Sequence, residues 1–220
     1  MTWKALIVIV VWLSFFSFWI IASFIYKTPK TKRVDKGWYL FLVSTFIITA
    51  MIEYLSVDYL LKRFELNHLF NQLINFFGIA LLLSGFFFAV WARIKLGSFW
   101  SGSVAVIEGQ PVIKHGPYSV VRHPIYTGVI AMLWGSFLII EIGFLLLTAI
   151  LGTIFLSWKA GLEETMLERY KGQEYTNYKK EKAGCEGQVY FLAIYLFQQD
   201  VRVRSTFLSF TYFFFIMPFR

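Results

Sequence analysis

The chain has 220 residues, of which 58% are hydrophobic and 20% aromatic, and its formal net charge is +8 at pH 7. Soluble domains of this size are usually less than half apolar, so the composition argues against a soluble domain and indicates a helical membrane protein. The single cysteine, Cys185, excludes an intrachain disulfide and a metal site built from cysteines. The basic residues lie in loops beside apolar runs, which favours anionic lipid headgroups rather than nucleic acid as their partner.

Three apolar runs in the first part of the chain predict membrane-spanning helices, because each is near the length that a bilayer core requires. They cover residues 5–26, 38–57 and 72–92. No small-residue cleavage site follows the first run, so we expect a retained helix there rather than a signal peptide.

The next two segments differ sharply in polarity. Residues 93–123 are rich in glycine and proline, which argues against one long helix. Residues 125–158 are apolar and too many for one ordinary span. Glu141 near the middle predicts a hairpin with arms over residues 125–140 and 144–158, and with Glu141 at the far membrane interface. A charged amphipathic segment is expected after this hairpin.

Positive charge sets the expected orientation, since Lys and Arg gather in cytoplasmic loops. Most of them lie in the loop before residue 38, in residues 93–123 and after Lys159. These segments should therefore share the cytosolic side. The expectation is an all-α polytopic membrane protein with about five transmembrane helices, its N-terminus outside and its C-terminus inside.

Residues 116–128 hold the densest group of side chains that could carry chemistry. Tyr118 and Tyr126 could pack a cation against their ring faces. Arg122 and His123 stand between them. An interfacial belt is the alternative, because Tyr, Arg and His are common at membrane edges. The whole constellation at this spacing favours a binding site.

Pro124 is well suited to the first turn of a helix. The N-terminus of that helix would lie beside His123 with unpaired backbone N–H groups. Such a helix end is a natural place for a carboxylate, including that of a free amino acid.

Glu163 and Glu164 follow the hairpin. Adjacent helical positions point about 100° apart, so we expect one carboxylate to face inward, where it could balance a sulfonium or ammonium charge, and the other to face solvent. A solvated helix start is the alternative. Lys159 precedes Glu163 by four residues on the same helical face, either as a surface ion pair or as a group that holds an anionic substrate.

Arg93 and Lys95 end the third apolar run. They could reach out to the membrane surface and anchor that span. Alternatively, with the Gly-Ser-Phe-Trp-Ser string at residues 97–101, they could form the rim of a cofactor pocket.

These residues, taken in order, resemble the isoprenylcysteine carboxyl methyltransferase family of integral membrane enzymes, in a prokaryotic-type form. The pattern is Trp-Ala-Arg-x-x-Leu-Gly-x-x-Trp-Ser from Trp91, Gly-Pro-Tyr-x-x-x-Arg-His-Pro-x-Tyr-x-Gly from Gly116, the apolar hairpin, Glu163-Glu164 and Tyr175-x-x-Tyr178. It covers about residues 91–182, under half of the chain.

The resemblance implies S-adenosyl-L-methionine as the cofactor, no metal, and a methyltransferase region over residues 93–182 behind the three helices of residues 1–92. It implies a cytosolic pocket between the segment before the hairpin and the last helix, in a bacterial or archaeal plasma membrane. The implied cofactor-binding residues are Gln110, Pro111, Val112, Ile113, Gly116, Tyr118, His123, Pro124, Ile125, Tyr126 and Glu163. The implied catalytic residues are Arg122, Lys159 and Glu163.

The implied acceptor is lipophilic, an isoprenylcysteine-type carboxylate or a related lipid. In the eukaryotic enzymes an arginine four residues before the glutamate contacts substrate, and Lys159 stands here instead. The charge is kept, whereas bidentate recognition of a carboxylate is lost.

Other interpretations stay open. A phospholipid or amine N-methyltransferase would need His123 or Glu163 to take a proton from its acceptor. A membrane reductase with a nicotinamide cofactor can share the Arg-His-Pro-x-Tyr string, and a non-catalytic scaffold can keep the fold. Residues 183–220 depart from the family pattern, and neither their role nor an oligomeric state follows from it.

Overall fold

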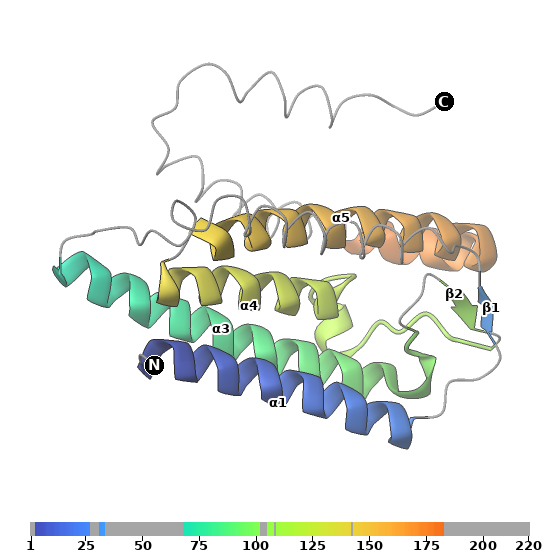
Figure 1. Ribbon diagram of the computed structural model, residues 1–220. Coiled ribbons are helices and arrows are strands. Elements are labelled where there is room, and N and C mark those ends of the chain that lie inside the picture. The colour runs from blue at the N-terminus through green and yellow to red at the C-terminus, as the bar shows by residue number, and fades with distance from the viewer. Residues whose placement is uncertain are drawn as a thin grey trace, which may run out of the picture. The chain divides into compact units, whose positions relative to one another are not determined.

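The computed structural model describes residues 3–26, 31–33, 68–101, 105–107, 109–141 and 143–182 (Figure 1). This part of the chain is helical apart from one short two-stranded ladder, as the composition predicted. Its elements are α1 (Trp3–Ile25), β1 (Thr31–Arg33), α3 (His68–Leu96), the 3₁₀ turn η1 (Gly97–Phe99), β2 (Ala105–Ile107), the 3₁₀ turn η2 (Gly116–Ser119), α4 (Pro124–Ile140) and α5 (Gly143–Lys171). A further helix covers residues 173–182.

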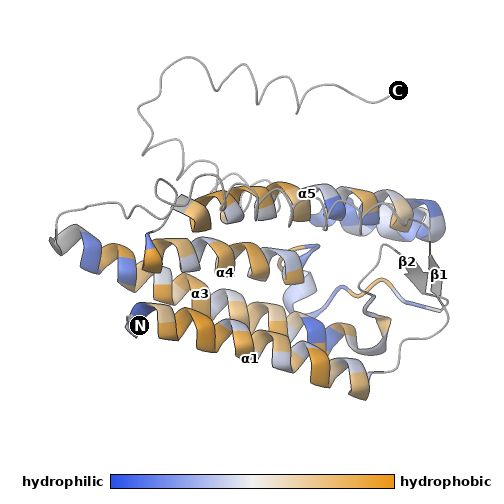
Figure 2. Cartoon of the chain, in the orientation of Figure 1, coloured by the Kyte–Doolittle hydropathy of each residue, from blue (hydrophilic) through white to orange (hydrophobic). Residues whose placement is uncertain are grey.

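Three of these helices, α1, α3 and α5, are long and apolar enough to cross a membrane. The spans predicted over residues 5–26 and 72–92 correspond to α1, which begins two residues earlier and ends one residue earlier, and to α3, which extends four residues further at each end. Figure 2 shows apolar residues along α1, α4 and the first part of α5. The described residues are therefore those of a polytopic integral membrane protein. The span predicted over residues 38–57 and the tail over residues 183–220 lie outside the described residues.

The predicted hairpin is confirmed, but its second arm does not end at Trp158. Helix α5 continues without a break to Lys171, because Lys, Ala, Leu, Glu and Met are strong helix formers and no proline interrupts them. The turn is made by Glu141, which adopts a left-handed φ of 60° and donates its N–H to Phe137 O at 2.7 Å. Glu141 is also buried, with Lys4 Nζ 3.2 Å from its carboxylate.

Glycines bring α3 and α4 into close contact. A methyl group on Gly128 would lie 2.6 Å from Gly85 O, and one on Gly85 would lie 2.5 Å from Gly128 O. Small residues allow this approach between helix backbones within a membrane. Helix α1 packs on the same pair, and Trp12 Nε1 donates to Ser136 Oγ at 3.0 Å.

A short ladder joins the segment after α1 to the polar stretch after α3. Strand β1 pairs antiparallel with β2, so that Thr31 lies opposite Ile107 and Arg33 opposite Ala105. The ladder and the start of α4 are at the end of the bundle where α3 finishes (Figure 1). The Lys4–Glu141 ion pair lies at the other end of the bundle. The charge pattern predicts that these two ends lie at opposite faces of the membrane.

Candidate active site

A cleft opens where α3 ends and α4 begins. Its walls come from the end of α3, the stretch before η2, the first turn of α4, the polar half of α5 and the helix over residues 173–182. The residues that line it are Leu96, Phe99, Trp100, Ser101, Gln110, Pro111, Val112, Ile113, Tyr118, Arg122, His123, Pro124, Ile125, Tyr126, Glu163, Met166, Leu167, Lys171, Tyr175 and Tyr178.

The structure brings all of the predicted cofactor residues except Gly116 to this cleft. Gly116 instead turns the chain with a φ of +65°, and a methyl group there would lie 3.3 Å from the Lys95 side chain. Of the residues implied as catalytic, Arg122 and Glu163 line the cleft. Lys159 does not, and is buried with its Nζ 5.3 Å from the centre of the Tyr126 ring.

The first turn of α4 points its N-terminal end at the cleft. Pro124 occupies the first helical turn, and His123 precedes it with no side-chain capping hydrogen bond. The first backbone N–H groups of a helix lack partners within the helix and carry a partial positive charge. Because Pro124 and Ile125 line the cleft, this helix end can receive an anionic group there.

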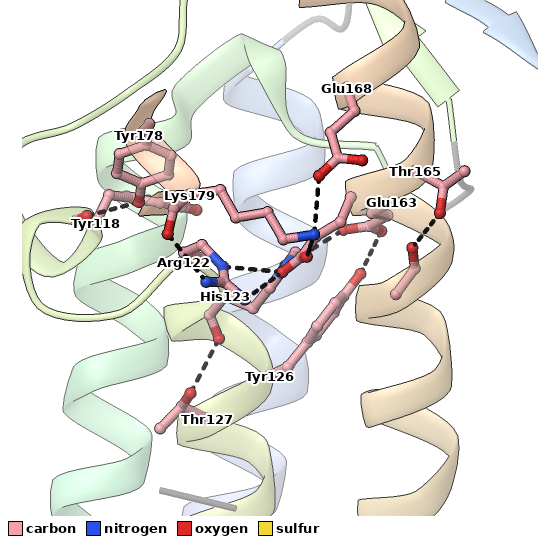
Figure 3. A network of polar contacts seen from close by, with 12 residues as sticks. Tyr118, Arg122, His123, Tyr126, Thr127, Glu163, Thr165, Glu168, Tyr178 and Lys179 are labelled. Atoms are coloured by element: carbon pink, nitrogen blue, oxygen red, sulfur yellow. Dashed lines mark hydrogen bonds and ion pairs between the residues drawn. The ribbon is translucent and has the colours of Figure 1, made fainter. Parts of the chain in front are cut away.

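Tyr126 and Glu163 bring an aromatic ring and a carboxylate together in the lining of the cleft. Tyr126 Oη donates a hydrogen bond to Glu163 Oε1 (Figure 3). The Tyr126 ring also stacks on His123, with ring centres 5.6 Å apart and planes 6° apart. A carboxylate beside aromatic ring faces is an arrangement that attracts an organic cation.

The prediction that one glutamate faces inward and the other faces solvent is wrong. Glu164 is more buried than Glu163, with side-chain exposures of 11% and 24%. The His123 imidazole lies between them, with Nε2 3.3 Å from Glu164 Oε1 and Nδ1 3.8 Å from Glu163 Oε2. Adjacent helical positions point about 100° apart. The His123 ring lies between these two directions, so both carboxylates reach it.

The helix over residues 173–182 is held against the opposite wall. Tyr178 Oη donates to Tyr118 O at 2.7 Å, and Lys171 Nζ, at the end of α5, donates to Gln110 O. Burial of Tyr118 raises the pKa of its phenol, and the nearby charge of Glu163 raises it further. Tyr118 therefore stays neutral over the physiological range and presents an uncharged ring to the cleft.

Arg93 does not reach out to the membrane surface. It is 1% exposed, its Nη1 donates to Gly97 O at 2.6 Å, and its guanidinium carbon lies 4.6 Å from the Trp100 ring centre and 5.2 Å from that of Tyr26. Phe99, Trp100 and Ser101 line the cleft. The structure therefore agrees with the interpretation of this string as a pocket rim, with Arg93 packed behind it.

Sequence reasoning missed part of the wall that α5 supplies. Met166, Leu167 and Lys171 line the cleft together with Glu163. Residues three, four and eight positions apart share one helical face, so a helical projection from Glu163 would have found them. The buried position of Glu164 had no such signal, because it depends on a histidine from a distant segment.

Comparison with known proteins adds a family match over this region. A sequence model of the family described as phospholipid methyltransferase matches residues 73–174, just under half of the chain. An uncharacterized protein of Bacillus subtilis (strain 168), YpbQ, is 37% identical over 51 residues, which are 23% of this chain and 30% of that protein. The match thus spans under a third of that relative's length. From α3 to just beyond the end of α5, the chain is similar to phospholipid methyltransferases.

Proposed function

We propose that the protein is an integral membrane methyltransferase that uses S-adenosyl-L-methionine to methylate a lipophilic acceptor. One observation carries the proposal: the cleft gathers residues of the methyltransferase-like pattern from four separate segments, from Leu96 to Tyr178. Most of them fall within residues 73–174, the range similar to phospholipid methyltransferases.

The residues present fit this cofactor. Glu163 and the rings of Tyr118 and Tyr126 suit a positively charged sulfur centre. The start of α4 suits the carboxylate of the amino acid part, and Gln110 to Ile113 would line the remainder. When bound, S-adenosylmethionine supplies a methyl group on a sulfonium. Held by these residues, it would donate that methyl group to the acceptor's lone pair, and the electron pair of the broken carbon–sulfur bond would stay on sulfur.

The chain's own contribution is mainly positioning. A carboxylate acceptor is already ionised at pH 7 and needs no base, so correct placement and exclusion of water account for the acceleration. Lys159 is buried beside Tyr126 and would hold the anionic group of such an acceptor. We infer an isoprenylcysteine-type carboxylate or a related lipid acid as the acceptor.

A phospholipid amine is the second candidate, and the family match favours it. An ammonium group must lose a proton before it can attack. His123 and Glu163 both reach the cleft and are the groups that would take that proton.

Cofactor binding tests the proposal. Detergent-purified protein should bind S-adenosylmethionine saturably by calorimetry. Glu163→Gln should weaken binding by at least about tenfold, or about 1.4 kcal/mol, because the amide no longer balances a positive charge. Wild-type protein that is folded and binds a nicotinamide cofactor instead would support a reductase. Binding of neither cofactor would support a scaffold.

The acceptor class can be read from the product. Membranes that contain the protein should transfer tritiated methyl groups to added isoprenylcysteine acids, and mild alkali should release the label because it cleaves methyl esters. Label that enters added phosphatidylethanolamine and survives alkali would establish N-methylation instead.

A further inference from the structure

Glu164 on α5 contacts polar side chains from two other segments, the stretch before α4 and the helix over residues 173–182. Figure 3 labels these partners, Arg122, His123 and Lys179. Glu164 Oε1 accepts a hydrogen bond from Arg122 Nε at 2.9 Å and is 3.3 Å from His123 Nε2. Its Oε2 is 2.8 Å from Lys179 Nζ. Among the described residues, Arg122 and His123 line the cleft whereas Glu164 stands behind them.

We propose that Glu164 is a positioning residue that fastens the helix over residues 173–182 across the cleft and so limits how fast the cofactor leaves. The inference rests on the proposed function, because it requires that the cleft binds S-adenosylmethionine.

The helix over residues 173–182 forms one wall of the cleft and is joined to α5 by a tight turn. It contributes Tyr175 and Tyr178 to the cleft. Gly172 joins it to α5 with a φ of +56°, a left-handed conformation that glycine adopts without steric cost. Movement about this turn would carry both tyrosines away from Tyr118, so the position of the helix sets how open the cleft is.

The contacts of Glu164 are strong enough to hold that helix. Its side chain is 11% exposed, and it accepts from two cations as well as from His123. Arg122 Nη1 also reaches Lys179 O at 3.4 Å. Arg122 is 10% exposed and Lys179 is 37% exposed, so the buried pair is Arg122–Glu164. Removing one member of a buried ion pair is strongly destabilising. Loss of the Glu164 charge would therefore displace Arg122, which contacts the helix at Lys179 O, and would remove one of the two carboxylates that hold Lys179.

Glu164 also fixes the imidazole. A carboxylate only accepts hydrogen bonds, so the Nε2 of His123 must carry the hydrogen that points at it. The other nitrogen, Nδ1, is then directed toward Glu163. Glu164 thus holds the helix over residues 173–182 in place and also sets the orientation of His123, which lines the cleft.

Glu168 provides a matched control. It lies 2.8 Å from the same Lys179 Nζ, but its side chain is 38% exposed. An exposed ion pair contributes little, because water solvates both charges well when the pair is broken.

The experiment measures release of tritiated S-adenosylmethionine from the full-length, detergent-purified protein after addition of excess unlabelled cofactor. Glu164→Gln should release it at least about tenfold faster, because a buried charge is lost. Glu168→Gln should stay within about twofold of the wild type. Amide hydrogen exchange should rise over residues 173–182 in Glu164→Gln and stay unchanged in α3 and α4. General destabilisation would instead raise exchange in α3 and α4 as well.

Wild-type release and exchange rates in Glu164→Gln would overturn this inference while leaving the proposed function standing. Wild-type protein that binds no S-adenosylmethionine would instead overturn the proposed function. If Glu164→Gln does not fold, Lys179→Gln tests the same contact from the other side, and wild-type release in that variant would equally overturn the inference.

Discussion

Lys159 is buried although its side chain ends in an ammonium group. It is 8% exposed, and its Nζ lies 5.3 Å from the centre of the Tyr126 ring. A cation over an aromatic face gains about 0.5–2 kcal/mol, depending on how far it is desolvated. Burial of a charge is otherwise costly, and the electrostatic attraction of Glu163 offsets part of that cost.

Replacement of Lys159 should affect the acceptor more than the cofactor. We expect Lys159→Met to raise the KM for an anionic acceptor by at least about tenfold, because a charge-assisted contact is lost. The Kd for S-adenosylmethionine should change by less than about threefold, since the residue is outside the cleft lining. Lys159→Arg keeps the positive charge but changes the geometry of its contacts, so it should raise the KM less than Lys159→Met does. Unchanged acceptor kinetics in Lys159→Met, measured with the methyl transfer assay, would exclude this role.

Lys179 makes the stability of the folded protein depend on pH in the alkaline range. Hydrogen bonds from its ammonium to Glu164 and Glu168 raise its pKa above the usual range. A raised pKa in the folded state contributes stability that is fully present below about pH 10.4, the unfolded value, and is lost as pH rises through the folded pKa. The thermal midpoint of the wild type should therefore fall above that pH more steeply than that of Lys179→Gln. Parallel pH profiles for the two proteins, from scanning fluorimetry in detergent, would contradict this assignment.

Part of the site could be predicted residue by residue. The cleft residues from Tyr118 to Tyr126 lie within nine consecutive positions, so their types and spacing were enough to identify them. The exposure of Glu164 could not be predicted in the same way. A helical projection gives the direction of a side chain and does not show which residue from another segment will meet it.

At the scale of elements, α3 and α4 pack through glycines because no side chain separates their backbones. A methyl group on Gly128 would also lie 2.8 Å from Ala89 Cβ. The facing atoms belong to helix backbones and cannot move independently. The contact therefore holds the N-terminal end of α4, and with it His123, at a fixed distance from α3.

A larger residue at this contact should destabilise the helix pair. Gly128→Ala should lower the free energy of unfolding by about 1–3 kcal/mol through overpacking. Gly161→Ala is the control, because a methyl group there meets nothing within 4 Å and should stabilise α5 by about 0.5–1 kcal/mol. Thermal unfolding in detergent compares the two variants. Equal midpoints would show that the glycine contact is not restrictive.

The helices could be predicted from the sequence except where a helix continues beyond its apolar part, as α5 does. Uninterrupted apolar runs identified α1, α3 and the hairpin. The sequence predicts that the second arm ends at Trp158, because the charged Lys159 follows it, whereas α5 continues to Lys171. In the structure α5 carries its charged residues into the cleft, so the change in polarity along α5 marks the site and not the end of a helix.

For the molecule as a whole, we propose that the cleft faces the cytosol. Lys32 and Arg33 of β1, and Arg93 and Lys95 in the last turn of α3, lie at the cleft end. Lys4 and Glu141 pair at the opposite end. Three described helices are long enough to span the bilayer between these ends.

Cysteine labelling checks this orientation. In a protein whose Cys185 is replaced by serine, Lys114→Cys should react with a membrane-impermeant maleimide only in inside-out vesicles. Gln72→Cys, at the start of α3, should react only in right-side-out vesicles. Both positions are exposed in the structure. The reverse pattern would place the cleft outside the cell.

The Lys4–Glu141 ion pair has a consequence for how the chain is made. The two residues are 137 positions apart, so the ribosome has synthesised Lys4 long before Glu141 exists. Until the turn between α4 and α5 reaches the same membrane face, the Lys4 ammonium must remain hydrated at the surface, because a lone charge is costly to bury. The pair therefore forms only after the hairpin has been inserted. A chain truncated before Glu141 would leave Lys4 of α1 without this ionic contact.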